Sequence, residues 1–244
     1  MATAAILTIG NEIVSGDTVN TNAAWLARRL EGLGVRVRLV GALPDEIDEI
    51  AQFVREQAPA VDFLLVTGGL GGTPDDLTRE AIAAAFQVPQ EEVGELAADL
   101  RARFTRDPEY AARWALLPAG SRVLANPRGG APGFVIQNVY VFPGLPAEME
   151  AMFDAIAEEF RSEAPIGVWR RVYRTRESEI AEILAEAGER WPAVLVGSYP
   201  SFEATGPEVE VVLKSSDETA FAEAIAYVER ELELGPAGRR SDRA

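Results

Sequence analysis

The 244-residue sequence contains no cysteine and no histidine. These absences exclude thiol nucleophiles, disulfides, iron–sulfur clusters, Ser-His-Asp triads and zinc sites built on imidazole or thiolate. Any chemistry must therefore rest on carboxylates, hydroxyls, arginines and backbone amides. A bound metal should be a hard ion held by oxygen atoms, and magnesium is the first expectation where phosphates are present.

Lysine is nearly absent as well, since Lys214 is the only one. The 39 Asp and Glu residues outweigh 23 Lys and Arg residues and give a net charge of −16. Acidic residues spread over every predicted helix are typical of a halophile-like, salt-adapted surface, or of a surface that simply keeps the protein in solution. Such a field repels nucleic acid, and no basic stripe with interleaved aromatic residues counters it. We expect no nucleic-acid partner.

Long hydrophobic runs are also missing. No segment approaches the ~18 apolar residues that a membrane span requires, and the N-terminus lacks a basic segment followed by an apolar stretch. Hydrophobic residues make up 48% and charged residues 25% of the chain, as in a globular protein. We expect a cytoplasmic protein without a membrane partner.

Short predicted strands and helices alternate along the first two thirds of the chain. Residues 4–9, 35–43 and 62–66 predict strands, and the helical spacing over residues 23–33 and 45–58 predicts the helices between them. This order favours a mainly parallel sheet with helices on both faces, a three-layer α/β/α architecture. The remaining predicted elements are a helix from Asp75-Asp76 to about Phe86, helices over 90–103 and 109–116, strands over 121–125 and 134–142, and a helix over 146–160.

The pattern changes after Ala164-Pro165. Strands are predicted over 168–174, 193–196 and 209–214, and helices over 177–187 and 217–232. This β-α-β-β-α order indicates a small α+β domain, whose simplest role is packing or dimerisation. We therefore expect domains at residues 1–165 and 166–234, followed by a disordered tail at 235–244 that is rich in Gly, Pro and Arg.

One glycine-rich loop carries the strongest functional signal: Thr67-Gly68-Gly69-Leu70-Gly71-Gly72-Thr73-Pro74-Asp75-Asp76. It follows an apolar strand and opens a helix, so backbone amides and the helix N-terminus form a ready anion site. The loop is neither a Walker A motif nor G-x-G-x-x-G, because it has no following lysine and the spacing differs. The alternative is a flexible turn whose aspartates only cap the helix.

Carboxylates follow the predicted strands at the same edge of the sheet. Asp75 and Asp76 either cap a helix or hold a divalent cation, because a carboxylate beside a polyphosphate repels it unless a cation intervenes. Glu12 follows the first strand in a polar loop that continues to Asn22. Asp45 follows the second strand, where a helix cap is the simpler local interpretation.

Two further loops combine rigid proline with permissive glycine, as ligand-binding loops often do, although both would also serve as ordinary turns. One runs from Asn126 to Gly133, and the other is Pro143-Gly144-Leu145-Pro146.

With these loops taken together, residues 4–160 resemble the N-terminal domain of the CinA (competence/damage-inducible protein A) family within the MoaB/Mog molybdopterin-binding superfamily. The resemblance rests on four motifs in order: Gly10-Asn11-Glu12 with Gly16 and Asn20-Thr21-Asn22, the glycine loop through Asp75-Asp76-Leu77-Thr78, Asn126 with Gly129 and Ala131-Pro132-Gly133, and Pro143-Gly144 with Pro146, Glu148 and Met149. The segment from about Gly167 is similar to the KH-like appendage of the same family. Gly72 departs from the pattern, which usually has proline there, and predicts a more flexible loop.

The resemblance implies binding of an adenylate- or pterin-bearing diphosphate and, as in CinA-like proteins, a metal-dependent pyrophosphatase activity on ADP-ribose, for which we expect magnesium or another divalent cation. It favours Asp76 and Asp45 as functional residues. Together with Glu12 from the first polar loop, these are the catalytic residues that we expect, and Asp75 and Asp76 are the expected metal ligands. The ligand-binding residues that we expect are Gly68, Gly69, Gly71, Thr73, Thr78, Asn22, Asn126 and Gly144.

Two other functions stay open: adenylyl transfer to molybdopterin, and a module that binds a nucleotide or pterin without turnover. We also expect a homo-oligomer, a dimer or trimer, and no nicotinamide mononucleotide deamidation, because the deamidase domain of the family is not in this sequence.

Overall fold

The computed structural model describes residues 2–162, 166–203 and 206–238, and the chain divides into two compact units, residues 1–163 and 164–244. Over these described ranges, no helix combines the length and the apolar character needed to cross a lipid bilayer.

The first unit is built on a six-stranded sheet with the order β2-β1-β3-β8-β7-β6. The first four strands in this order, β2, β1, β3 and β8, are parallel. Strand β7 pairs antiparallel with β8, and β6 pairs antiparallel with β7. The mainly parallel sheet predicted from the sequence is therefore confirmed. The strands are β1 (Thr3–Ile9), β2 (Arg36–Leu43), β3 (Phe63–Thr67), β6 (Arg122–Leu124), β7 (Gly133–Ile136) and β8 (Val139–Phe142).

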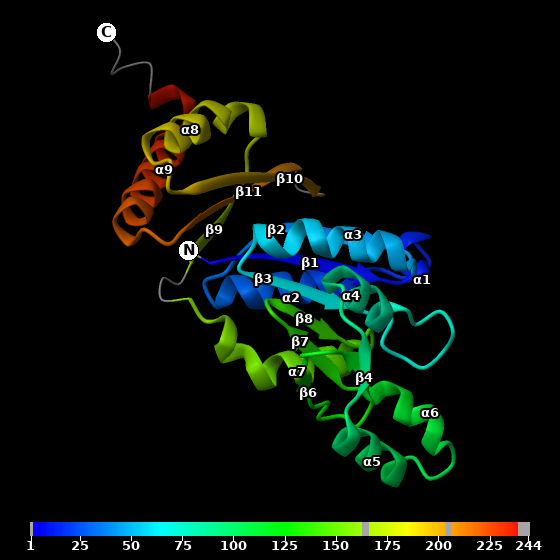
Figure 1. The fold of residues 1–244 in the computed structure, drawn as a ribbon. Helices are drawn as coiled ribbons and strands as arrows, with labels where there is room; N and C mark the ends of the chain where they lie inside the picture. The colour runs from blue at the N-terminus through cyan, green and yellow to red at the C-terminus, as the bar shows by residue number, and fades with distance from the viewer. Residues whose placement is uncertain (1, 163–165, 204–205, 239–244) are drawn as a thin grey trace. The chain divides into compact units, whose positions relative to one another are not determined.

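Helices cover both faces of this sheet (Figure 1). Strand β1 explains why, because its side chains are buried on both sides: Leu7 packs toward one helical layer and Ile6 toward the other. The first layer contains α3 (Ile47–Gln57), the short η1 (Ala58–Ala60) and α4 (Thr78–Phe86). The second contains α2 (Thr21–Gly32), α7 (Pro146–Ile156) and η3 (Ala157–Phe160). The three-layer α/β/α architecture is confirmed.

The single strand predicted over residues 134–142 is wrong, because the structure has a hairpin of β7 and β8. Gln137 at the turn adopts a left-handed backbone with φ of 51°. The Asn138 side chain donates hydrogen bonds to the carbonyl oxygens of Ala58 and Val61, at 2.8 and 2.9 Å. The polar pair Gln137-Asn138 interrupts the apolar run of residues 133–142, and this break is the signal of a two-residue turn that the single-strand prediction overlooked.

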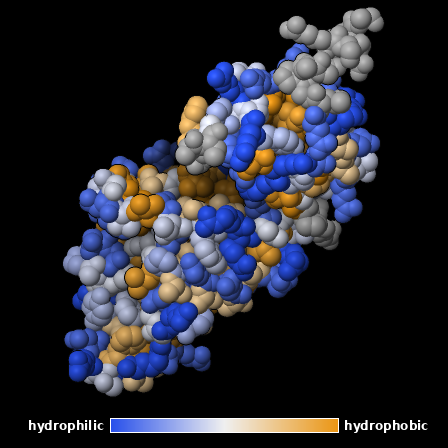
Figure 2. Space-filling view, turned by 180° about the vertical axis from the view of Figure 1, so that it is seen from behind, coloured by the Kyte–Doolittle hydropathy of each residue, from blue (hydrophilic) through white to orange (hydrophobic). Residues whose placement is uncertain are grey.

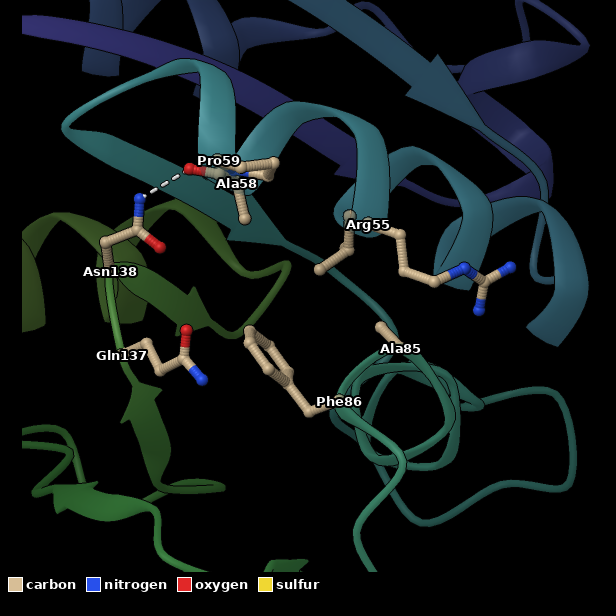
Figure 3. A pocket seen from close by; sticks show the side chains of 8 residues that line it. Arg55, Ala58, Pro59, Ala85, Phe86, Gln137 and Asn138 are labelled. Atoms are coloured by element: carbon tan, nitrogen blue, oxygen red, sulfur yellow. Dashed lines mark hydrogen bonds between the residues drawn. The ribbon is translucent and has the colours of Figure 1, made fainter.

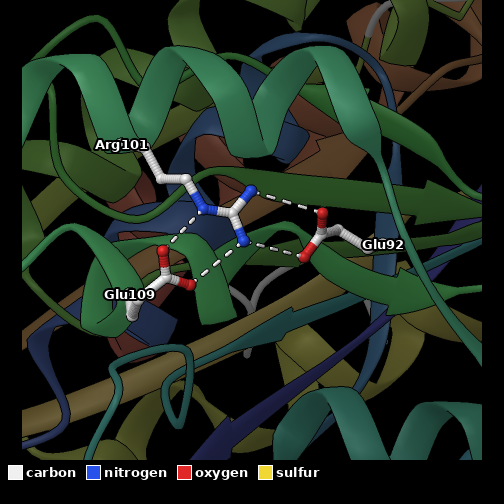
Figure 4. Close-up of polar contacts among 3 residues, drawn as sticks. All are labelled: Glu92, Arg101 and Glu109. Atoms are coloured by element: carbon white, nitrogen blue, oxygen red, sulfur yellow. Dashed lines mark hydrogen bonds and ion pairs between the residues drawn. The ribbon is translucent and has the colours of Figure 1, made fainter.

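The helix predicted over residues 90–103 is wrong in its first part. Residues 90–92 form β4 (Gln90–Glu92), which pairs antiparallel with β5 (Leu116–Pro118). The helix itself is α5 (Gly94–Arg103), and the helix expected over 109–116 is α6 (Pro108–Ala112) followed by η2 (Arg113–Ala115). Arg101 joins these pieces, because its guanidinium contacts Glu109 at 3.0 Å and Glu92 at 3.3 Å (Figure 4).

Helix α4 begins at Thr78, two residues later than predicted from Asp75-Asp76. The Asp76 side chain accepts a hydrogen bond from the backbone N–H of Thr73 at 2.8 Å, and this holds residues 73–76 as a turn before the helix. The short helix α1 (Asn11–Val14), at the end of β1, was not predicted; the sequence indicated only a polar loop there.

The second unit has the predicted β-α-β-β-α order. Its three strands form an antiparallel sheet in the order β10-β11-β9, packed on two helices. The elements are β9 (Gly167–Tyr173), α8 (Glu177–Arg190), β10 (Leu195–Glu203), β11 (Gly206–Ser215) and α9 (Glu218–Gly238). The tail expected to be disordered from residue 235 is wrong for residues 235–238, which continue α9, while residues 239–244 lie outside the described part of the chain.

Hydrophilic side chains, drawn blue, cover much of the molecular face in Figure 2, with hydrophobic side chains in smaller patches between them. This distribution agrees with the acidic composition, because charged residues remain in water while apolar residues fill the interior.

Helix α4 ends on a strained residue that offers a test of the fold. Gln87, the C-cap, is exposed and left-handed, with φ of 57°. Glycine adopts this conformation without a Cβ penalty, so Gln87→Gly should raise the free energy of unfolding by about 0.5–1 kcal/mol. Gln52→Gly, at an exposed position inside α3, is the matched control and should lower it by about 1 kcal/mol. Urea denaturation measures both, and equal losses in the two variants would contradict the assigned cap.

Candidate functional site

The strand register brings the predicted loops to one edge of the sheet. Ile9 pairs with Leu43 across β1 and β2, Thr8 pairs with Thr67 across β1 and β3, and Thr67 pairs with Phe142 across β3 and β8. The residues that follow these strand ends therefore meet at the same edge: Gly10, Asp45, Gly68 and Pro143. This is the edge where ligands bind in open parallel sheets.

The glycine loop starts at a position that only glycine can occupy. Gly68 has a φ of 109°, and a Cβ added there would lie 2.0 Å from the carbonyl oxygen of Ile9. Its own N–H donates to the carbonyl oxygen of Phe142 at 3.1 Å. The loop is therefore anchored between the ends of β1 and β8.

The carbonyl oxygens of residues 68–71 are all bound by the first two residues of α4. The Thr78 hydroxyl donates to Gly68 at 2.9 Å, and the Thr78 N–H donates to Gly69 at 3.2 Å. The guanidinium of Arg79 donates to the carbonyl oxygens of Leu70 and Gly71, at 2.8 and 2.7 Å. Thr78 and Arg79 are both buried, so they shape the loop from inside.

Sequence reasoning missed Arg79, although a signal was present. Arg79 shares the buried stripe of α4 with Ile82 and Ala83, at the spacing of an apolar helix face, and an arginine there needs buried acceptors. Burial lowers the pKa of the Arg79 guanidinium, and nearby Glu80 and Asp76 oppose that shift.

The backbone N–H groups of the loop differ from its carbonyl oxygens. Within the described part of the chain, no residue accepts a hydrogen bond from the N–H groups of residues 69–72. These amides lie just before the N-terminus of α4, whose dipole favours negative charge. The loop is polarised in this sense: the protein binds its carbonyl oxygens and leaves its N–H groups without a protein acceptor.

Carboxylates lie close to the glycine loop. Asp45 lies beside Gly69 and accepts a hydrogen bond from the N–H of Asn11 at 3.1 Å. Partial burial raises the pKa of Asp45, the Asn11 hydrogen bond opposes this, and the negative charges of Glu12, Asp75 and Asp76 add to the increase. The structure thus brings the four predicted acidic residues into one electrostatic cluster.

Over the described residues, no three acidic side chains are grouped closely enough to hold a metal ion by themselves. One oxygen of Asp76 is already engaged by the backbone and hydroxyl of Thr73. Magnesium is commonly held by one or two carboxylates together with substrate phosphates, and the all-oxygen donor set here fits that mode.

A cavity of about 90 Å³ adjoins the loop. Asn22, the second residue of α2, is buried beside it and donates hydrogen bonds to the Thr67 hydroxyl at 3.2 Å and the Gly144 carbonyl oxygen at 2.8 Å. Thr67 in turn donates to the carbonyl oxygen of Pro143 at 2.9 Å. These bonds join α2, β3 and the loop after β8.

Asn126 is not among the residues that line this cavity. Its amide donates to the carbonyl oxygen of Ala131 and to Glu148, both at 2.9 Å, and its Oδ1 accepts from the N–H of Arg128 at 2.9 Å. Asn126 therefore holds the shape of its own loop and ties it to α7.

The ring of Tyr110 packs against Gly72. A Cβ added at Gly72 would lie 2.6 Å from Cζ of Tyr110, so this part of the loop is limited by a contact with α6. The sequence predicted a more flexible loop from the loss of proline, but it gave no sign of the tyrosine that occupies the space.

A larger cavity, of about 240 Å³, lies beside the β7–β8 turn, at the opposite edge of the sheet (Figure 3). Its walls are mostly apolar, and the ring of Phe86 from α4 lies on the side of Gln137. No carboxylate or glycine loop lines it, so size alone does not make it the candidate site.

The loop geometry predicts that Arg79→Met lowers the free energy of unfolding by about 2–3 kcal/mol, because two carbonyl oxygens lose a charged donor while the side-chain volume is kept. Arg28→Met, at an exposed position of α2, is the control and should stay within about 0.5 kcal/mol of the parent. Equal stability of the two variants in urea would show that Arg79 does not support the loop.

Comparisons with known proteins agree with this geometry. A family model described as "Probable molybdopterin binding domain" matches residues 5–162, and one described as "FAD synthase, middle domain" matches residues 170–237. A protein of Archaeoglobus fulgidus is 40% identical over 201 residues, covering 80% of this chain and 84% of that protein. A CinA-like protein of Parasynechococcus marenigrum is 40% identical over 196 residues, covering 74% of this chain but only 47% of its own length.

The crystal structure of the protein CinA from Thermoplasma acidophilum superposes with a TM-score of 0.62 at 32% identity, covering 65% of this chain and 98% of that one. The family match spans the whole first unit, including every loop at the candidate site. The chain therefore belongs to the molybdopterin-binding domain family, as a CinA-like member of the MoaB/Mog superfamily.

Proposed function

We propose that this chain binds a nucleotide- or pterin-bearing diphosphate at the glycine loop and hydrolyses the pyrophosphate bond of ADP-ribose or a similar nucleoside diphosphate. The polarised loop is the observation that carries the proposal. Thr78 and Arg79 bind its carbonyl oxygens, and the N–H groups of residues 69–72 are left for phosphate oxygens. Fixed amides of this kind stabilise charge that develops on phosphate during reaction.

The carboxylates supply the remaining chemistry. Asp75 and Asp76 would hold magnesium, which neutralises phosphate charge. Asp45, whose pKa is raised, or Glu12 would orient water and accept its proton as the water oxygen attacks phosphorus. The bridging P–O bond then breaks and gives AMP and ribose 5-phosphate from ADP-ribose. Asp45 and Glu12 lie at the ends of neighbouring strands, so either can reach a phosphate on the loop.

The direct test is incubation of the purified protein with ADP-ribose and magnesium at high salt, with chromatographic detection of AMP. Asp76→Asn should lower kcat by about 100-fold or more, because it removes the charge of the expected metal ligand. Asp48→Asn, an exposed change in α3, is the matched control and should leave the rate unchanged.

Other outcomes separate the alternatives. AMP release that is equal in Asp76→Asn and in the parent would refute the assigned role of Asp76. Tight binding without AMP would leave a binding module, and ATP-dependent adenylate transfer to molybdopterin would indicate a transferase.

Replacing Asp45 should stabilise the fold and lower the activity. Its raised pKa means that the folded state holds the proton more tightly than the unfolded chain, so ionised Asp45 destabilises the fold at neutral pH. Asp45→Asn should therefore melt at a higher temperature than the parent at pH 7 in EDTA while losing activity. This difference should disappear as the pH falls toward the ordinary value of 3.8.

Asp62→Asn is a control of opposite sign. Hydrogen bonds from Thr3 lower the pKa of Asp62, so its ionised form stabilises the fold above the ordinary value, and this contribution is lost as the pH falls through the lowered pKa. Asp62→Asn should melt at a lower temperature than the parent at pH 7. Melting curves from pH 3.5 to 8 measure both, and shifts of the same sign would contradict the electrostatic assignment.

A further inference from the structure

The cavity beside the glycine loop contains a buried hydrogen-bond acceptor that the fold itself leaves unused. Asn22 is 7% exposed, and its Oδ1 atom has no hydrogen-bond partner among the described residues. A buried acceptor without a partner costs free energy, so its presence at a cavity calls for a ligand group. The cavity is lined by Thr8, Glu12, Thr18, Asn22, Gly68 and Gly144, among others.

The orientation of the Asn22 amide is fixed by its neighbours. Its nitrogen faces the Gly144 carbonyl oxygen, which can only accept a hydrogen bond. The Thr67 hydroxyl uses its proton on Pro143 and so accepts from Asn22 as well. Exchanging the amide oxygen and nitrogen would break both bonds. The atom left for a ligand is therefore an acceptor.

Several other polar groups around the cavity have the same character, while the hydroxyls of Thr18 and Thr21, which also line it, can donate or accept. The Thr8 hydroxyl donates its proton to Asn20 Oδ1, which also accepts from the N–H of Ala23 and caps α2. Glu12 contributes a carboxylate. These groups accept hydrogen bonds and would repel a phosphate, which excludes Asn22 as a direct phosphate ligand.

A ligand group for this cavity must donate hydrogen bonds and be compact. It must also adjoin the phosphate, because Gly68 both lines the cavity and opens the anion-binding loop. A ribose attached to a diphosphate meets these conditions, since its hydroxyls donate hydrogen bonds and lie within a few bonds of phosphorus. Val19, a further lining residue, is 78% exposed and offers an apolar rim to the rest of the ligand.

We propose that this cavity is the ribose subsite of the ligand and that Asn22 Oδ1 accepts a hydrogen bond from a ribose hydroxyl. The proposal rests on the nucleotide binding proposed above. It makes Asn22 a specificity-determining residue that distinguishes ribose from deoxyribose.

Calorimetric binding tests this with ADP, 2′-deoxy-ADP, 3′-deoxy-ADP and ADP-ribose. If the cavity holds the adenosine ribose, the parent should bind ADP about three- to tenfold more tightly than 2′-deoxy-ADP or 3′-deoxy-ADP, as expected for one hydrogen bond. If it holds the terminal ribose, the parent should bind ADP-ribose more tightly than ADP by about the same factor. Asn22→Ala should abolish this preference.

Thr67→Val is the matched control. It removes a scaffold bond of Asn22 but keeps Oδ1, so it should weaken all ligands alike and preserve the preference. A preference that is absent in the parent, or that survives in Asn22→Ala, overturns the ribose subsite while nucleotide binding stands. Failure of all four ligands to bind overturns the proposed function as well.

Discussion

The functional edge of the sheet depends on the buried hydroxyl of Thr67. Thr67 is fully buried at the end of β3, where it accepts a hydrogen bond from Asn22 and donates one to the Pro143 carbonyl oxygen. A hydroxyl is the smallest group that can do both. Two segments far apart in sequence, α2 and the loop after β8, are thereby fixed relative to β3, the strand from which the glycine loop departs. The sheet register and the hydrogen bonds of the Thr67 hydroxyl thus determine where the loop begins, independently of the contacts that the loop itself makes.

From that anchor, the loop divides its two kinds of backbone group. Its carbonyl oxygens bind Thr78 and Arg79 inside the protein, and no described residue accepts a hydrogen bond from the N–H groups of residues 69–72. Glycine is required at Gly68 because the backbone there approaches Ile9 too closely for any side chain. Arg79 binds carbonyl oxygens rather than a carboxylate, and the negative charges of nearby Glu80 and Asp76 oppose only part of the cost of burying it. The two hydrogen bonds to Leu70 and Gly71 fix the shape of the loop.

The sequence was sufficient for the architecture and for bringing the predicted loops to one edge of the sheet, and insufficient for the contacts of single atoms. Alternating strands and helices predicted the parallel sheet, and the rule that ligands bind beyond the strand ends placed Glu12, Asp45 and the glycine loop together. The β7–β8 hairpin was missed because the polar pair Gln137-Asn138 between its apolar arms is short and was read as part of one strand. Residues 90–92 were missed because their strand exists only through pairing with Leu116–Pro118, a contact that no local pattern records. Whether Thr78 meets a ligand or the loop's own carbonyl oxygen depends on side-chain direction, which spacing does not encode.

The charge of the site explains why its chemistry should need a cation. None of the described residues lining the cavity is cationic, and Arg79 directs its guanidinium to carbonyl oxygens on the inner side of the loop. Burial raises the pKa of Asp45, and the negative charges of Glu12, Asp75 and Asp76 add to this increase before any phosphate binds. Backbone amides carry only partial charges, so they cannot by themselves offset both the cluster and a diphosphate. A divalent cation between carboxylates and phosphates removes both repulsions at once, and in a protein without histidine or cysteine the oxygen-rich edge of the sheet is where such an ion would bind.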